Sequence, residues 1–369
     1  MDRRQFLKST AAVPLAAALP HAAWAQQQPA MFAPKPGPWR SFDLVTRIEI
    51  SDPKDKLQAW IPLPSVNAAD WVRAGDSKWT TNAVSATRVR DAKYGAEMLH
   101  VVWKDNEPAP VVEVTSRVSL RDRAVDLGKP GNAAPLSAAE RALYLEGTEL
   151  IPVDGIVKQT SDRIVANART EIEKARAIYD WVVENTFRNA ATRGCGTGDI
   201  AAMLKTGNLS GKCADLNALY VGLARAAGLP ARDIYGLRVA PSQFGYKSLG
   251  AGSADVTKAQ HCRAEVYLSG FGWVPVDPAD VRKVVLEEPP ANLALNDPKV
   301  IAARQALFGA WEGNWLPYNV AHDVALPGSN HPRLGFLMYP QAERASLLLD
   351  CLDPATFKYA LTAKPASTA

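Results

Sequence analysis

The spacing of apolar residues changes near residue 125, and this change predicts two kinds of structure in one chain. Before that point apolar residues alternate with polar ones, which is typical of strands with one buried face. The alternating residues are Phe42, Leu44, Ile48 and Ile50, and later Val112, Val114, Val118 and Leu120. We therefore expect an antiparallel β domain over residues 41–125, after a linker rich in proline and glutamine over residues 26–40.

Beyond residue 125 the sequence carries helix signals. Two pairs have the spacing of a capping box at a helix start, namely Ser137 with Glu140 and Thr170 with Glu173. A further helical pattern begins at Cys213, and the strand-like segments HCRAEVYL and WVPVD follow it around the turn SGFG. This mixture predicts an α+β fold, with a second domain over residues 132–290. Residues 291–369 would form a C-terminal extension with a helix over 299–308 and the strand candidates FLMYP and FKYALTA.

The N-terminus has the features of an export signal. Arg3 and Arg4 precede a short apolar stretch that Pro14 and Pro20 interrupt, and a site with small residues follows. This pattern predicts a twin-arginine signal peptide over residues 1–25. The stretch is shorter than the roughly 18 residues that a membrane span needs, and no later segment is long and apolar enough. We therefore expect a periplasmic protein without a membrane span, whose partner during targeting is the twin-arginine export machinery.

Charge and cysteine content argue against several classes of function. Lys and Arg total 42 and Asp and Glu total 38; three of the basic residues and one of the acidic residues lie in the signal peptide. The remainder is close to neutral, so nucleic acid is not an expected partner. The four cysteines form no C-x-x-C pair, and no His-x-x-x-His spacing is present. We expect neither a structural metal site nor a disulfide framework.

Cys213 has the setting most suggestive of chemistry. A thiol attacks as its thiolate, which a helix N-terminus and a neighbouring cation stabilise. Cys213 opens a helical pattern and follows Lys212, while Gly211 allows a sharp turn into the helix. A phosphate-binding loop does not fit, because three residues separate Gly207 from Gly211 and a cysteine follows the lysine. The alternative interpretation of Cys213 is a small buried hydrophobe.

A cysteine nucleophile needs a base and a group that orients the base. Strand alternation in HCRAEVYL directs Cys262 and its apolar partners toward the core and places His261 on the opposite face. In WVPVD the same argument places Asp277 on the side of the histidine. If the two strands pair across their turn, His261 lies opposite or diagonal to Asp277. A carboxylate there would stabilise an imidazolium, which in turn would stabilise the thiolate.

The segments SGKCADLNALYVGLARAAGLPAR, HCRAEVYL and GWVPVDPAD, taken in this order, resemble the transglutaminase-like superfamily, which is related in fold to papain. The resemblance covers about residues 165–280. It implies a catalytic domain whose nucleophile stands at a helix N-terminus packed on an antiparallel sheet. Cys213 would be the nucleophile, His261 the general base and acid, and Asp277 the orienting carboxylate. The resemblance implies no cofactor.

These features predict an exported enzyme that transfers acyl groups through a thioacyl intermediate. The acyl donor would be an amide of a peptide or protein, including the glutamine type, and water is favoured over an amine as acceptor. A cysteine protease or amidase is thus expected rather than a cross-linking transglutaminase. Two alternatives stay open: a non-catalytic peptide-binding module with the same fold, and a thiol-disulfide oxidoreductase that uses Cys213 with Cys195.

Three further residues are candidates for substrate binding. Superfamily members commonly carry an aromatic residue where Arg263 stands, and a guanidinium there would bind a substrate carboxylate or pair with Glu265 or Asp277. Trp311 and Trp315 would line a cleft, or else anchor a loop to the core.

The remaining patterns are less distinctive. Cys195 and Cys262 would form a disulfide, or Cys262 would be a small core residue. His100 falls within a strand pattern and has the character of a structural residue, whereas His322 and Asp323 are candidates for a second site.

Overall fold

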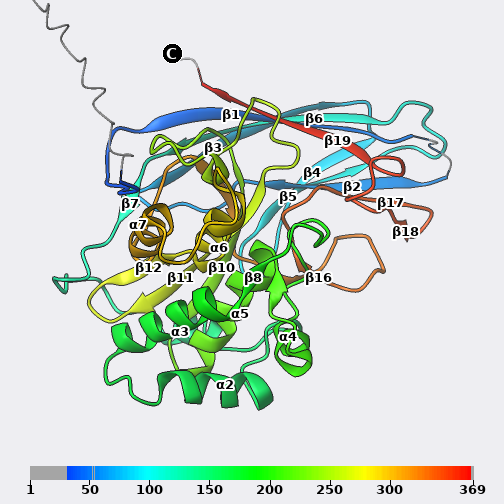
Figure 1. The fold of residues 1–369 in the computed structure, drawn as a ribbon. Helices are drawn as coiled ribbons and strands as arrows, with labels where there is room; N and C mark the ends of the chain where they lie inside the picture. Colours follow the sequence, from blue (N-terminus) through cyan, green and yellow to red (C-terminus); the bar gives the residue numbers. More distant parts are fainter. Residues whose placement is uncertain (1–30, 52, 54, 367–369) are drawn as a thin grey trace, which may run out of the picture. The chain divides into compact units, whose positions relative to one another are not determined.

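The computed structural model describes residues 31–51, 53 and 55–366, so the predicted signal peptide over residues 1–25 lies outside the described residues. Two antiparallel sheets are built from the first strands of this part and its last strands (Figure 1). One sheet has the order β19 (Lys358–Pro365), β1 (Arg40–Glu49), β6 (Val111–Leu120), β3 (Val72–Thr81). The other has the order β18 (Leu347–Leu348), β17 (Gln341–Arg344), β2 (Leu57–Leu63), β5 (Glu97–Val102), β4 (Ser85–Arg90). Both sheets contribute to one apolar core, which includes Ile48, Ile61, Leu99, Val114 and Phe357.

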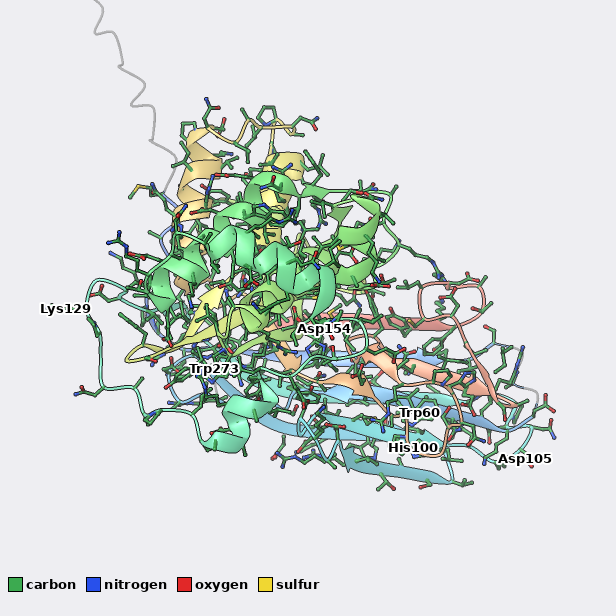
Figure 2. The ribbon with its side chains drawn as sticks, turned by 90° about the horizontal axis from the view of Figure 1, so that it is seen from below. Trp60, His100, Asp105, Lys129, Asp154 and Trp273 are labelled. Carbon is green, nitrogen blue, oxygen red and sulfur yellow. The ribbon has the colours of Figure 1, made fainter. Side chains whose placement is uncertain are left out.

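The alternating pattern of the sequence accounts for these sheets. In β1, Leu44 and Ile48 are buried, whereas Arg47 and Glu49 are exposed. His100 of β5 stacks on Trp60 of β2, with ring centroids 5.3 Å apart (Figure 2). The Nε2 atom of His100 also lies 3.0 Å from the side-chain oxygen of Gln58. These contacts give His100 a packing role. The antiparallel pairing of β1 with β6 and of β2 with β5 confirms the predicted β region.

Residues after 291 do not stay apart from the rest of the chain. β19 pairs with β1 and β17 pairs with β2, so the C-terminal strands complete both sheets of the β region. β14 (Trp315–Asn319) instead joins β10 in the sheet that carries the site. The predicted strand FKYALTA corresponds to β19, whereas FLMYP contributes only Phe336, at the end of β16 (Leu334–Phe336), because the chain turns irregular at Leu337.

The second part of the fold is an antiparallel sheet covered by helices. Its order is β12 (Gly272–Val276), β11 (Gln260–Leu268), β10 (Ala231–Arg238), β14. Helix α5 (Cys213–Ala226) packs on β10 and β11, and α2 (Gly155–Val165) and α3 (Glu171–Asn185) pack on α5 (Figure 1). Every residue from Cys213 to Arg225 is buried, because α5 has the sheet on one side and helices on the other. This is the predicted α+β arrangement, with Cys213 at the helix start.

The capping boxes begin helices as predicted. Ser137 caps α1 (Ala138–Leu143) and Thr170 caps α3, each with a reciprocal glutamate bond. The helix expected over 299–308 is α7 (Pro298–Ala306). The remaining elements are α4 (Ile200–Thr206), α6 (Pro278–Glu287), the 3-10 turn η1 (Lys247–Leu249) and the short strands β7 (Arg123–Ala124), β8 (Phe187–Arg188), β9 (Ser210–Gly211), β13 (Ala310–Trp311) and β15 (His322–Val324). Within the described ranges, every helix is too short or too polar to cross a bilayer.

Candidate active site

Cys213 stands at the mouth of α5, and Asp215 holds that mouth in shape. The Asp215 carboxylate accepts hydrogen bonds from three backbone amides, those of Lys212 at 2.9 Å, Thr197 at 3.0 Å and Gly198 at 2.9 Å. The loop before α4 is thereby joined to the helix start. Cys213 itself is 3 % exposed. Its amide is the first of the helix and has no carbonyl partner one turn earlier within the helix.

Two glycines make this arrangement sterically possible. A Cβ atom at Gly196 would lie 1.8 Å from the Asp215 carboxylate, and one at Gly211 would lie 2.4 Å from it. Gly196 also has a φ of 94°, which favours glycine. The glycines of GCGTG and SGKC therefore enclose a carboxylate of the protein itself. Sequence reasoning missed Asp215, although an acidic residue at the third position of a helix is a known capping signal.

His261 lies on β11 and contacts two carboxylates. Its Nε2 atom is 2.8 Å from Oδ2 of Asp277 and 3.3 Å from Oδ2 of Asp280. Ala264 pairs with Val276, which places Asp277 diagonal to His261, in agreement with the expected register. Because carboxylates hold Nε2, Nδ1 is the ring nitrogen left for the interaction of His261 with the Cys213 thiol.

Asp277 is itself tied to the helices on both sides. It caps α6, where its Oδ1 accepts a bond of 3.0 Å from the Asp280 amide. The same oxygen accepts a bond of 3.2 Å from the side-chain amide of Asn217, which also donates to the Cys262 carbonyl at 2.8 Å. Asn217 lies one helical turn after Cys213, so one side chain fixes α5 relative to the histidine strand and its carboxylate.

Asp280 brings a buried arginine into the site. The Arg238 guanidinium donates to Oδ1 of Asp280 at 2.5 Å, and both side chains are almost fully buried. Ligand atoms of His261, Asp277 and Asp280 lie within 4.8 Å of one another and could hold a metal ion. Arg238, and Arg263 with Nε at 3.7 Å from Asp277, already supply positive charge to these carboxylates. A protonated imidazole fits the charge of the group better than a divalent cation.

The protonation of the pair follows from its surroundings. Burial opposes the charged form of His261, and Arg238 acts in the same direction, but Asp280 and Asp277 outweigh both and raise the pKa of His261 to about 9. The pKa of Cys213 is lowered well below its usual value, first by the adjoining Cys195 and Cys262 thiols and, against the effect of burial, by His261. The raised pKa of His261 and the lowered pKa of Cys213 together favour a thiolate beside an imidazolium.

Three of the four cysteines gather at this point. Burial and the negative charge at Cys213 raise the pKa of Cys262, and the pKa of Cys195 is also raised, first by its contact with Cys213. The Cys195 thiol lies 3.5 Å from the Gln260 carbonyl, to which it donates. All four cysteines are free thiols in the structure. Of the two alternatives for Cys195 and Cys262, a disulfide or a small core residue at Cys262, the structure therefore has the second, with both thiols buried and neutral.

Arg263, Trp311 and Trp315 lie behind the histidine and not along the cleft. All three are buried, and the Arg263 guanidinium stacks over Trp315 at 4.7 Å and over Trp311 at 5.3 Å. The indole of Trp315 donates to the His261 carbonyl at 2.9 Å. This placement favours the pairing of Arg263 with Asp277 and the anchoring role of the tryptophans, which were the alternatives to substrate binding.

A cleft of about 340 Å³ opens above the sulfur. Cys195, Cys213 and His261 lie among the residues that line it. Aromatic side chains from the C-terminal strands and loops form part of its wall: Tyr339, Phe357 and Tyr359. The sequence carries no sign of this wall, because its residues lie more than 75 positions after His261.

Comparison with known proteins places this geometry in a family. Residues 158–278, which carry Cys213, His261 and Asp277, match the sequence family described as the Transglutaminase-like superfamily. The chain belongs to the transglutaminase-like superfamily. An uncharacterized protein of Haemophilus influenzae is 37% identical over 339 residues, which cover 88% of this chain and 90% of that protein.

One solved structure of similar size supports the fold. A candidate cysteine protease from Cytophaga hutchinsonii has a TM-score of 0.50 at 14% identity, covering 89% of this chain and 99% of that chain. The periplasmic domain of TgpA from Pseudomonas aeruginosa, solved with ethylmercury, is more distant, with a TM-score of 0.34 at 18% identity over 69% of this chain and 77% of that one. Residues 1–20 match the twin-arginine translocation signal sequence, so this superfamily member is exported to the periplasm.

Proposed function

We propose that the protein is a cysteine-dependent acyl-transfer enzyme in which Cys213, His261 and Asp277 act together. The observation that carries the proposal is the position of Cys213 at the start of a buried helix, beside a histidine that two carboxylates hold. The positive charge of the ring favours the thiolate, and so does the helix N-terminus. The cleft above the sulfur gives a substrate access to it.

In this proposal the Cys213 thiolate attacks the carbonyl carbon of a peptide or protein amide. The developing oxyanion accepts a hydrogen bond from the Cys213 amide at the helix start. Nδ1 of His261 gives its proton to the leaving amine, and a thioester remains on the sulfur. His261 then takes a proton from water, which attacks the thioester and releases a carboxylic acid. Water is the acceptor we favour, because it is the abundant nucleophile in an exported enzyme.

The reactivity of individual thiols tests the proposal. Iodoacetamide at pH 6, with mass spectrometry of each cysteine peptide, should modify Cys213 at least about 100-fold faster than Cys195, Cys262 or Cys351, because only a thiolate reacts and an ordinary thiol has a pKa of about 8.5. Equal and slow modification of all four would support a binding module without chemistry.

The acceptor is tested separately. Synthetic peptides incubated with the enzyme in H₂¹⁸O should gain one labelled carboxyl oxygen at each cleaved amide, and a Cys213→Ala protein should produce none. If added amines were incorporated in place of the label, the enzyme would be a transglutaminase and not a hydrolase.

A further inference from the structure

The cleft above Cys213 is lined by cations. The positively charged side chains along it are Arg188, Arg193, Lys212, Arg238, Lys258 and Lys283. Among the described residues, neither an aspartate nor a glutamate lines the cleft. The whole chain has 42 basic and 38 acidic residues, so this one-sided lining is a local feature and not a consequence of composition.

The carboxylates behind these cations do not balance them. Arg188 and Lys283 share a single partner, Glu287, with the lysine nitrogen 3.6 Å from its carboxylate. Arg193 pairs with Asp350 at the rim.

The deepest cation, Arg238, is matched by Asp280. Lys212 and Lys258 form no ion pair in the described part of the chain. The exposed Asp255 is close enough to feel the charge of Lys258 but does not line the cleft. The lining thus carries a surplus of positive charge that the protein leaves open to the cleft.

Lys283 supports the presence of this surplus. Burial, and next the charge of Arg238, lower the pKa of Lys283 to about 8. An anion that enters the cleft would stabilise the charged form of Lys283, because its negative charge offsets both the cost of burial and the repulsion from Arg238. Lys258 and Arg193 are the exposed cations of the set, and Arg193 already pairs with Asp350, whereas Lys212 directly precedes Cys213 in the chain.

We propose that the cleft selects acidic peptides, in which carboxylates stand next to the amide that Cys213 attacks. The proposal rests on the proposed acyl-transfer function and adds the substrate class to it. The carboxylates meet Lys258 and Lys212 on entry, and the favourable charge raises the rate at which the amide reaches the sulfur. Neutral or basic peptides of the same length lack this attraction or are repelled.

Two alkylating reagents of similar size read out the charge of the cleft without any substrate. Iodoacetate is an anion and iodoacetamide is neutral. The measured quantity is the rate of iodoacetate at Cys213 divided by that of iodoacetamide, normalised by the same ratio for N-acetylcysteine. This normalised ratio should be about ten or more at low ionic strength and should fall toward one in high salt. Lys258→Glu should lower the ratio by about tenfold. Lys78→Glu makes the same charge change on an exposed residue of β3 and should leave the ratio unchanged.

The outcomes separate the two proposals. If Cys213 reacts slowly with both reagents, the acyl-transfer function fails and the substrate class falls with it. If Cys213 reacts fast with iodoacetamide but its normalised ratio stays near one in the parent and in Lys258→Glu, the function stands and the substrate class is wrong. Peptide pairs that differ only by Glu in place of Gln provide the direct confirmation, with kcat/KM at least about tenfold higher for the acidic member and a smaller preference in Lys258→Glu.

Discussion

Two buried histidines in this protein have similar neighbours and opposite properties. His261 and His322 are each 3 % exposed, and each faces a buried aspartate with a buried arginine nearby. The Nε2 atom of His261 is 2.8 Å from Asp277, whereas that of His322 is 3.7 Å from Asp233 and makes no hydrogen bond among the described residues. The pKa of His261 is raised to about 9, while burial lowers the pKa of His322 well below its usual value.

The difference shows that a histidine forms part of a reactive site through its contact with a carboxylate and its access to the cleft, more than through its residue type. Burial, and next the charge of Asp280, raise the pKa of Asp277, but its contact with His261 acts against that rise. Asp277 also accepts hydrogen bonds from the ring, the Asp280 amide and Asn217, which favour its charged form beside His261. The Asp233 carboxylate has no hydrogen-bond partner among the described residues, and burial raises the pKa of Asp233 to about 7. His322 contacts the Tyr235 hydroxyl at 3.3 Å and does not line the cleft. Its neighbour Asp323 accepts a hydrogen bond of 3.3 Å from the Glu149 amide.

The largest effect that would test this contrast is on stability. The folded-state pKa of Asp233 is raised to about 7 from a usual 3.8, so the folded state binds more protons between these values and stability falls as pH rises through that window. Asp233→Asn removes the titrating carboxyl group, so the variant does not lose this stability as the pH rises. The unfolding free energy of the variant relative to the parent should therefore shift in favour of the variant by up to about 4 kcal/mol between pH 4 and pH 8. Urea denaturation at the two pH values measures this shift; a difference that stays constant with pH contradicts it.

A pair of alanine variants compares the two rings directly. His261→Ala should slow iodoacetamide modification of Cys213 at pH 6 by about 100-fold or more, because the thiol returns toward a pKa of about 8.5 and its thiolate fraction falls accordingly. His322→Ala is the matched control, and its rate should stay within about threefold of the parent. Equal losses in the two variants would mean that the effect is one of folding, and the contrast between the histidines would disappear.

The role of the second carboxylate sharpens the account of His261. The charge of Asp280 raises the His261 pKa more than that of Asp277 does, so Asp280→Asn should lower that pKa by about one unit or more. NMR titration of the His261 ring measures the change, with Asp105→Asn, an exposed site far along the β region (Figure 2), as the control. An unshifted His261 titration in Asp280→Asn would assign the raised pKa to Asp277 alone.

The smallest expected effect concerns the thiol cluster. Cys195 adjoins Cys213 and is the first contributor to its low pKa, yet its own proton already has the Gln260 carbonyl as acceptor. Cys195→Ala should therefore raise the apparent pKa of Cys213 by only about half a unit, or about threefold in rate on the acidic limb of the alkylation profile. Complete loss of reactivity would instead favour a redox pair of Cys195 and Cys213.

The parts that sequence could predict are those that depend on neighbouring residues in the chain. The start of α5 at Cys213 and the approach of His261 to Asp277 follow from helix and strand periods across a short turn, and the 2.8 Å contact confirms that approach. Asp215 and Gly196 escaped notice because their contact joins a loop to a helix that begins well after it. Burial of Arg263 between Trp311, Trp315 and Asp277 depends on strand β14, which comes from beyond residue 291.

The cleft wall was out of reach for the same physical reason. Tyr339, Phe357 and Tyr359 reach the site only because β17 and β19 pair with β2 and β1, about 300 residues earlier in the chain. Such pairing leaves no periodic mark in the sequence, since any exposed strand edge can accept a partner. Likewise, nothing in the spacing of His261 and His322 distinguishes the histidine that contacts its carboxylate from the one that does not.

The measurement that tests the central claim most directly is the ultraviolet absorbance of the thiolate near 240 nm, recorded from pH 4 to pH 10 for the parent and for Cys213→Ala. The account predicts that the difference between the two proteins already corresponds to one thiolate at pH 6, well below the usual titration of cysteine. A difference that emerges only above about pH 8 would show Cys213 to be an ordinary buried thiol and would contradict the account.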